Sequence, residues 1–445
     1  MKSIIIGINH NFIKSIIRIG LIILVLLPLV AHAATADRET EITKEQRDDG
    51  LTIVLREPSQ PKEEIQYLTL ILKTGYAHDP AGKYGLTNLT NELIHYLFKR
   101  TGALQVESQT YADYSAFHFV VTRSGFNEFC SQLDRILRTD ALLLYDLCNE
   151  ITRYHLNLPK TPELKGLSQF YSLVYGPNHP YNSVFSSNYD QLDIVEVNKW
   201  FRQIYKPNNL IIATSIKLPI DFLRRPAGRD LKEAVAVGKI SPAAANPNYE
   251  LKWAPVRDNC VTVCLGFEAA KFGEEGVFAT LLLEKYLNQR LWKIIREDHG
   301  LSYDPGVYYQ LNSKSSAPLL QVALHTIAAD TGTVINLILT EFKKIAAEGI
   351  PEEELTKIKE QERKRLELIE KDQESVIRAA ALFGLSDQKW LINTEGYLTQ
   401  LAAEAKIVPL VMTKGLARLK VSVAGPEDTG EYLNRVMTME PLQQK

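Results

Sequence analysis

Two side chains that can bind a metal ion lie three residues apart within residues 85–95. A helix would place Glu92 and His95 on one face, and His78 lies in the loop that precedes it. A zinc site takes at least three protein ligands, so one carboxylate and one imidazole do not complete it. We therefore favour a solvated glutamate and a half-buried histidine near a helix end, and keep a metal site here as the weaker alternative.

The four cysteines do not suggest a metal cage or a disulfide scaffold. Cys260 and Cys264 lie in an apolar pattern typical of a strand, where four residues span about 13 Å, too far for a disulfide bond. Buried free thiols are the favoured interpretation for all four. A bridge between Cys130 and Cys148 on neighbouring helices stays open as an alternative.

Length and charge limit the class of protein. A chain of 445 residues exceeds what one hydrophobic core usually serves, so two or more domains are expected. The net charge is −2, with 51 basic and 53 acidic residues spread along the chain. This balance argues against a nucleic-acid partner.

The N-terminus has the pattern of a secretory signal. Basic residues precede an apolar run at 19–30, and small residues follow at Ala31 and Ala33. We predict a signal peptide at 1–33 and a periplasmic or secreted protein. An uncleaved anchor is the alternative, but the run holds about a dozen residues against the roughly 20 that a membrane span needs. No integral membrane segment is expected after cleavage.

Both halves of the chain show the same order of predicted elements: strand, helix, strands, helices and a closing strand. Runs of strands and of helices without strict alternation predict an α+β fold with antiparallel-dominated sheets flanked by helices. We expect tandem homologous domains at 34–217 and 249–440, joined by a linker at 218–248, and a flexible polar segment at 35–47. Strands are expected at 51–55, 65–73, 106–121 (a pair), 210–216, 260–267, 307–310, 319–325 and 419–424, and helices at 85–99, 126–137, 142–156, 167–174, 195–205, 275–296, 331–348, 352–368 and near Val408.

Several short motifs, in order and at fitting separations, resemble the pitrilysin/insulinase family of zinc peptidases over nearly the whole mature chain. The resemblance implies two α/β roll domains in a clamshell arrangement that closes around an extended peptide substrate. It also implies that chains of this length pair, often as one zinc-bearing and one metal-free subunit. The motifs are Gly85-Leu86, His179-Pro180-Tyr181, Tyr205-Lys206-Pro207-Asn208-Asn209, the stretch 290–303 and Gly349-Ile350-Pro351 with the acids that follow.

The resemblance also shows what is missing from residues 85–95. The family carries the inverted zinc motif H-x-x-E-H there, and the matching positions in this chain read Asn88, Asn91 and Glu92. An amide oxygen is a poor zinc ligand, and an amide cannot act as a general base. The zinc motif is therefore degenerate.

The third zinc ligand is missing as well. The family supplies a glutamate from a following helix, which here spans about 142–151. The expected positions of the glutamate are Leu143 and Leu144, and the nearest acids are Asp146 and Glu150.

The segment between Phe98 and Gln105 is also shorter than in the family, which usually inserts a helix there.

The second half retains a family motif, whereas the motif of the first half is lost. Residues 290–303 resemble R-L-x-x-x-I-R-E-x-x-G-L-x-Y, in which the second arginine and the tyrosine bind the substrate peptide and stabilise the oxyanion. Arg296 and Tyr303 match both residue types and their spacing. The alternative is an arginine in a surface ion pair and a tyrosine in the core. We interpret His179-Pro180-Tyr181 as a structural turn, and the charged run 357–371 as a solvated helix face supported by ion pairs four residues apart.

These observations predict an exported, metal-free member of the family that is inactive alone. It would bind peptide and complete the active site of a homologous zinc-bearing peptidase through Arg296 and Tyr303, with zinc in the partner subunit only. The main alternative is a scaffold or assembly protein of the same fold with no role in proteolysis. A peptidase with an unorthodox metal site ranks last.

Overall fold

The structure is a computed structural model that describes residues 42–57, 64–158, 161–223, 248–257, 259–309, 318–431 and 433. The predicted signal sequence at 1–33 and residues 224–247 of the predicted linker lie outside this part of the chain. Two mixed sheets, one of six strands and one of five, are flanked by helices, which confirms the predicted α+β class. Within the described ranges, no helix is both long and apolar enough to cross a membrane.

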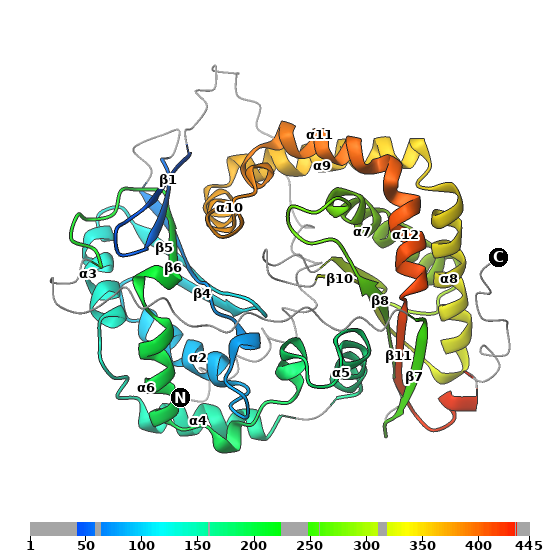
Figure 1. Cartoon of the computed structure of the whole chain (residues 1–445), viewed down its shortest axis with the longest axis horizontal. Helices are drawn as coiled ribbons and strands as arrows, with labels where there is room; N and C mark the ends of the chain where they lie inside the picture. The colour runs from blue at the N-terminus through cyan, green and yellow to red at the C-terminus, as the bar shows by residue number, and fades with distance from the viewer. Residues whose placement is uncertain are drawn as a thin grey trace. The chain divides into compact units, whose positions relative to one another are not determined.

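The first half, residues 42–223, contains the six-stranded sheet, with the strand order β1-β2-β6-β3-β5-β4 (Figure 1). Its pairs are antiparallel except for β2 with β6. Apolar sides of α2, α3, α4 and α6 pack with the strands into one core. The elements are β1 (Ile42–Gln46), β2 (Thr52–Arg56), β3 (Ile65–Leu72), α2 (Leu86–Phe98), β4 (Gln105–Thr110), β5 (Ser115–Thr122), α3 (Phe126–Leu137), α4 (Tyr145–Leu156), α5 (Pro162–Tyr175), α6 (Ile194–Ile204) and β6 (Leu210–Thr214), with short 3-10 turns η1 (Tyr76–His78), η2 (Pro180–Phe185), η3 (Tyr189–Gln191) and η4 (Pro207–Asn209).

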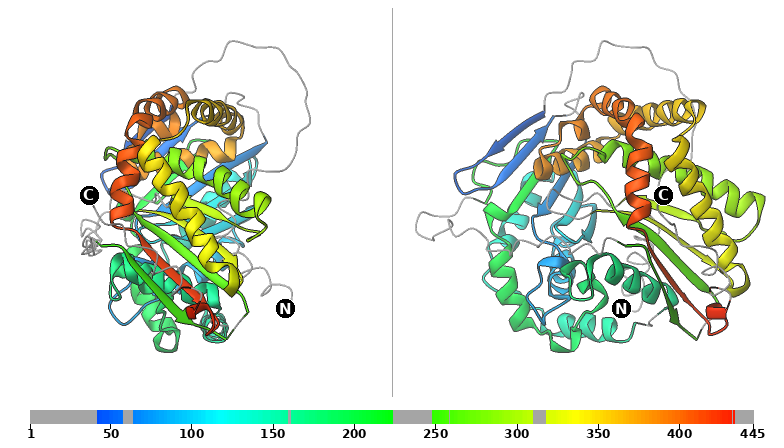
Figure 2. Two further views of the ribbon diagram at one scale, coloured as in Figure 1. Left: turned by 90° about the vertical axis from the view of Figure 1, so that its right-hand side faces the viewer. Right: turned by 45° about the vertical axis from the view of Figure 1, so that its right-hand side comes forward.

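The second half, residues 248–433, contains the five-stranded sheet, with the order β7-β11-β8-β10-β9. The C-terminal strand β11, drawn in red, runs beside the green strand β7 in Figures 1 and 2, and this pair is parallel. The elements are β7 (Glu250–Pro255), β8 (Val261–Glu268), α7 (Val277–Leu291), the π-helix η5 (Trp292–Asp298), β9 (Gly306–Tyr309), β10 (Leu319–Thr326), α8 (Thr331–Glu348), α9 (Glu352–Lys371), α10 (Gln373–Ser386), α11 (Thr394–Glu404), α12 (Val408–Ala417) and β11 (Lys420–Gly425), with 3-10 turns η6 (Ala328–Asp330), η7 (Lys389–Ile392) and η8 (Ala405–Ile407).

The two sheets share one topology, as the repeated order of elements predicts. Strands β2 to β6 of the first half pair in the same pattern as β7 to β11 of the second half, and β1 is an addition at one edge. Each half also begins its first long helix at a glycine with left-handed backbone, φ +97° at Gly85 and φ +99° at Gly276. The domain boundaries drawn from the sequence remain predictions.

Each half lends one helix to the sheet of the other. α5 packs on β8 and β11, and α10 packs on β2, β3 and β6. These helices cover the second apolar face of each sheet, because strands with apolar side chains on both faces need cover on both. At the edges of the first sheet, Arg378 of α10 pairs with Glu107 at 2.6 Å, and Asp387 pairs with Lys44.

The structure corrects several expectations. Residues 42–46 of the segment expected to be flexible form β1, an edge strand whose exposed side chains need not be apolar because it packs little core. The charged run on α9 is not wholly solvated, since Glu362 is buried and pairs with Arg365 at 2.7 Å. All four cysteines are free thiols, so there is no Cys130–Cys148 bridge. The strand β7 and the helices α10 and α11 were not predicted from the sequence.

Candidate functional site

The first turn of α2 is capped by a partly buried carboxylate. Asp79 accepts hydrogen bonds from the backbone N–H groups of Gly85 (2.7 Å) and Thr87 (2.8 Å). Burial raises the pKa of Asp79 to about 7, against the hydrogen bonds from Thr87 and Gly85, which lower it. This carboxylate takes the place of an N-cap side chain, which the glycine at position 85 cannot supply.

Asn91, at the position of the family's general base, is part of the protein interior. Its side chain is 3% exposed, and its amide nitrogen donates to the hydroxyls of Thr110 and Ser115, both at 2.8 Å. Its amide oxygen accepts from the Tyr205 hydroxyl at 2.7 Å. The amide thus joins α2 to β4, β5 and the end of α6, with neutral partners throughout.

Asn88 and Glu92 contact the stacked rings of Tyr189 and His155. Tyr189 is in hydrogen-bonding contact with the Asn88 side chain, and its ring stacks on that of His155 with centroids 4.1 Å apart and planes 4° apart. His155, in the last turn of α4, lies 2.8 Å from Glu92 through Nε2 and Oε1. The side chains of His155 and Glu92 are 15% and 24% exposed. Reasoning from the sequence missed His155 and Tyr189, because neither occupies a motif position.

The residues around Glu92 do not fit a zinc ion. One carboxylate and one imidazole form the pair described above, and the neighbouring positions carry amides. In the part of the chain that the structure describes, no three His, Cys, Asp or Glu side chains group so that they could hold a metal. His95 and His78, which the sequence placed near Glu92, are held uncharged: burial lowers the pKa of each to about 4.

The segment that should carry the third zinc ligand is also unsuited to the task. Leu143 and Leu144 precede α4, which begins at Tyr145, and the Leu143 side chain is 76% exposed. Asp146 and Glu150 are on exposed surface of the helix. The helix contributes His155 to the neighbourhood of Glu92, ten residues or more beyond the predicted positions.

The second-half motif divides into anchoring and exposed positions. Leu291 and Ile295 are fully buried, and Arg290 pairs with the buried Glu341 at 3.1 Å. The helix that the sequence predicts to run to residue 296 changes at Trp292 into a π-helix, which ends at Asp298. Such segments are rare and often occur at functional sites.

Arg296 and Tyr303 lie next to each other on the surface. An Arg296 terminal nitrogen donates to the Tyr303 carbonyl oxygen at 2.9 Å, and the guanidinium carbon lies 5.7 Å from the Tyr303 ring centroid. Gly300, with φ +63°, turns the chain back between them. Tyr303 is 83% exposed, and Arg296 has no ion pair among the described residues, so the alternative of a core tyrosine and a surface ion pair is wrong.

A histidine that the sequence reading left without a partner pairs beside this site. His325 Nδ1 lies 2.6 Å from Asp304 Oδ2, and the neighbouring carboxyl of Glu163 comes from α5 of the first half. The hydrogen bond to Asp304 raises the pKa of His325, and burial opposes that rise. The charges of Asp304 and Glu163 raise it further. His299 is exposed and bonds to the Ile294 carbonyl at 2.7 Å. In the turn at 179–181, Tyr181 donates to Asp113 at 2.8 Å in the interior, as a structural role requires.

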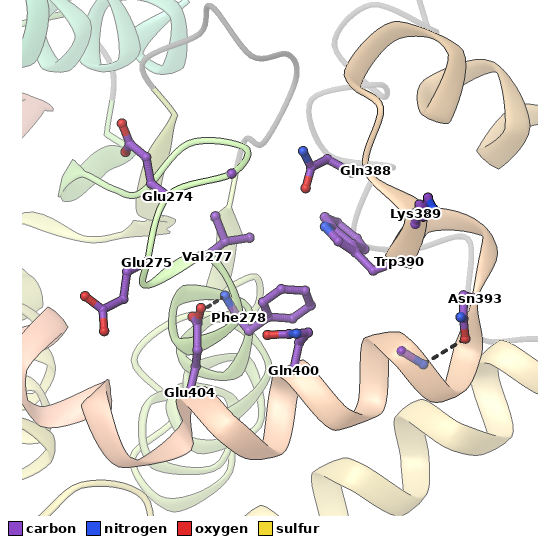
Figure 3. A pocket seen from close by; sticks show the side chains of 12 residues that line it. Glu274, Glu275, Val277, Phe278, Gln388, Lys389, Trp390, Asn393, Gln400 and Glu404 are labelled. Atoms are coloured by element: carbon purple, nitrogen blue, oxygen red, sulfur yellow. Dashed lines mark hydrogen bonds between the residues drawn. The ribbon is translucent and has the colours of Figure 1, made fainter.

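A pocket of about 430 Å³ lies at the N-terminus of α7 (Figure 3). Neither Arg296 nor Tyr303 lines it. Its wall includes Phe278, Trp390 and Glu404. Glu404 accepts hydrogen bonds from the N–H groups of Gly276, Phe278 and Ala279 at 2.9–3.1 Å. Its carboxylate therefore caps α7 as Asp79 caps α2, which is a structural task.

Comparison with known proteins agrees with the resemblance seen in the motifs. Residues 234–362 match the family model described as the Peptidase M16 inactive domain. No curated protein sequence matches the chain.

Solved structures share the fold at low sequence identity. A protease from Helicobacter pylori has a TM-score of 0.71 at 13% identity, covering 87% of this chain and 100% of that one. A peptidase M16 inactive domain from Pseudomonas fluorescens has a TM-score of 0.69 at 16% identity, covering 87% and 98%. The periplasmic protease PqqL from Escherichia coli has a TM-score of 0.64 at 13% identity, covering 94% of this chain and 51% of PqqL. The family match and the shared fold agree with the resemblance: residues 234–362 match the inactive domain of the M16 peptidases, and the chain shares the fold of solved members of that family.

Proposed function

We propose that this chain is an exported, non-catalytic subunit that binds an extended peptide and completes the active site of a homologous zinc-bearing peptidase. The observation that carries the proposal is the contrast between Asn91 and Arg296. The Asn91 amide is used up by three internal hydrogen bonds, whereas Arg296 lies at the surface without a carboxylate partner among the described residues.

The chemistry of Arg296 and Tyr303 suits peptide binding. A guanidinium has five N–H donors in one plane, and one Arg296 nitrogen donates to a backbone carbonyl within the chain. The remaining donors and the Tyr303 hydroxyl can meet a peptide carbonyl, where negative charge develops in the transition state of hydrolysis. The metal and the activated water would belong to the partner subunit, so this chain contributes binding and charge stabilisation.

The expected location supports the same assignment. The signal-like segment at 1–33 directs export, and one structural relative, PqqL, is described as a periplasmic protease. A periplasmic or secreted pair of homologous subunits would place both chains in one compartment.

The test is peptidase turnover by a pair reconstituted from this chain and a homologous peptidase with an intact H-x-x-E-H motif. With a quenched fluorogenic peptide, Arg296→Ala and Tyr303→Phe should each lower kcat by about 10²-fold, the usual effect of removing one oxyanion donor. Arg363→Ala is the control, because Arg363 lies at an exposed position and pairs with Glu395. Size-exclusion chromatography checks that the pair still assembles.

Two other outcomes would overturn the proposal. Unchanged turnover in an assembled Arg296→Ala pair would exclude the substrate-assisting role and favour the scaffold function. One equivalent of zinc in the purified chain, together with peptidase activity of the chain alone, would show that our account of Asn88, Asn91 and Glu92 is wrong.

A further inference from the structure

Arg296 rests on an aromatic ring that no family motif accounts for. Its guanidinium carbon lies 4.0 Å from the ring centroid of Trp292, closer than the 5.7 Å to Tyr303. Trp292 opens the π-helical segment and is 40% exposed. One turn of helix separates it from Arg296, so the stack is set by the local backbone.

This environment differs from that of six other arginines in the described part of the chain, which pair with a carboxylate. A carboxylate takes up N–H donors and neutralises the charge, whereas an aromatic ring contacts the face of the guanidinium and leaves the donors in its plane available. Arg296 has two rings and one backbone carbonyl as its described partners. The arginines that pair with Asp or Glu are Arg47, Arg138, Arg290, Arg363, Arg365 and Arg378.

We propose that Trp292 is a positioning residue of the peptide site: its indole ring holds the Arg296 guanidinium in a fixed plane, in which the donors not bonded to the Tyr303 carbonyl stay free. The inference rests on the proposed function, since it assigns Trp292 a role through Arg296. It assigns no contact between Trp292 and the peptide. A ring is needed for the role, and apolar bulk of similar size is not enough, because the attraction comes from the ring's electron-rich face.

The experiment is a double-mutant cycle in the assembled pair with the fluorogenic peptide. Trp292→Leu keeps apolar bulk and should lower kcat/KM by about two- to fivefold, the value of a cation–π contact at an exposed site. Trp292→Phe keeps a ring and should retain more than half of the activity. In an Arg296→Ala background, Trp292→Leu should cause no further loss. The matched control is Tyr249→Leu, since Tyr249 is also 40% exposed.

The outcomes separate this inference from the function on which it rests. If Arg296→Ala lowers turnover but Trp292→Leu does not, the positioning role is wrong and the proposed function stands. If Trp292→Leu lowers turnover equally with and without Arg296, Trp292 acts on its own and the inference is overturned. If Arg296→Ala itself has no effect on turnover, the proposed function is wrong, and the positioning role of Trp292 is wrong with it.

A measurement on the chain alone tests the stack without a partner subunit. Arg296→Ala uncovers the indole and should increase acrylamide quenching of tryptophan fluorescence, and this increase should vanish in the Trp292→Phe background. Equal quenching with and without the Arg296 side chain would show that the two side chains do not stack in solution, which would overturn the inference.

Discussion

The first turns of α2 and the end of α7 differ in what their polar side chains face. On α2, Asn91 and Glu92 are bound to other parts of the first half, to hydroxyls and to His155. After α7, Arg296 and Tyr303 face outward and contact mainly each other and Trp292. Polar groups that are satisfied internally stabilise a fold, whereas exposed donors without partners are free to bind a ligand. Asn91 therefore has a structural role in the first half, whereas Arg296 and Tyr303 remain available to a ligand.

Acid should give the largest effect, because the first half holds neutral, half-buried histidines. Burial lowers the pKa of His78 and His95 to about 4 and that of His118 to about 3, from the ordinary 6.5. The unfolded chain then binds more protons below pH 6.5, so their contribution to stability is full above that pH and is lost as the pH falls towards 4. His325 has the opposite sign: its pKa is raised, so its contribution is lost as the pH rises.

Urea unfolding at pH 7 and pH 5 checks this expectation. His95→Gln removes one buried imidazole, whose Nδ1 has no partner among the described residues, and should reduce the loss of stability between the two pH values. His299→Gln is the control, because His299 is exposed. An unaltered difference in His95→Gln would mean that His95 is not held neutral by burial.

Removal of the Asn91 amide should give the next largest effect. Asn91→Ala leaves the hydroxyls of Thr110, Ser115 and Tyr205 without this partner in the interior, which should lower the free energy of unfolding by about 3 kcal/mol. Chemical denaturation measures this loss. A cost below about 1 kcal/mol would contradict the structural role assigned to the position.

The helix cap at Asp79 should give a smaller effect. Asp79→Ala removes the acceptor for the N–H groups of Gly85 and Thr87 and should cost about 1–2 kcal/mol, whereas Asp79→Asn keeps an acceptor oxygen and should cost less. The raised pKa, about 7, means that the effect of Asp79 ionisation on stability favours low pH and fades as the pH rises through 7. Thermal unfolding of both variants at pH 6 and pH 8 tests the cap and the sign of this dependence.

The exposed pair should give the smallest effect on stability. Arg296→Ala and Tyr303→Phe remove surface groups and should change the free energy of unfolding by less than about 0.5 kcal/mol. Denaturation of each variant beside Asn91→Ala measures the contrast between the two regions directly. A loss near that of Asn91→Ala would show that the pair serves the fold, and the comparison would fail.

Much of the local structure was predictable from periodicity alone. The helices at 126–137 and 331–348 have the predicted bounds, because an apolar stripe at helical spacing and clear end signals are contained within the segment itself. The amides of Asn88 and Asn91, where the family motif has a histidine and a glutamate, were equally visible in the sequence, as was the position of Arg296 and Tyr303 in a stretch that resembles a family motif.

The sequence by itself determined the α+β class, the tandem order of elements and the residue types at positions 88, 91 and 92, since residue type and local spacing carry that information. Only the tertiary structure decided that α5 and α10 cover the opposite sheets, that His155 meets Glu92 across 63 residues of chain, and that Trp292 lies against Arg296. The physical reason is that an apolar face requires burial but does not specify the element against which it packs. Contacts between distant segments depend on how all the elements pack together.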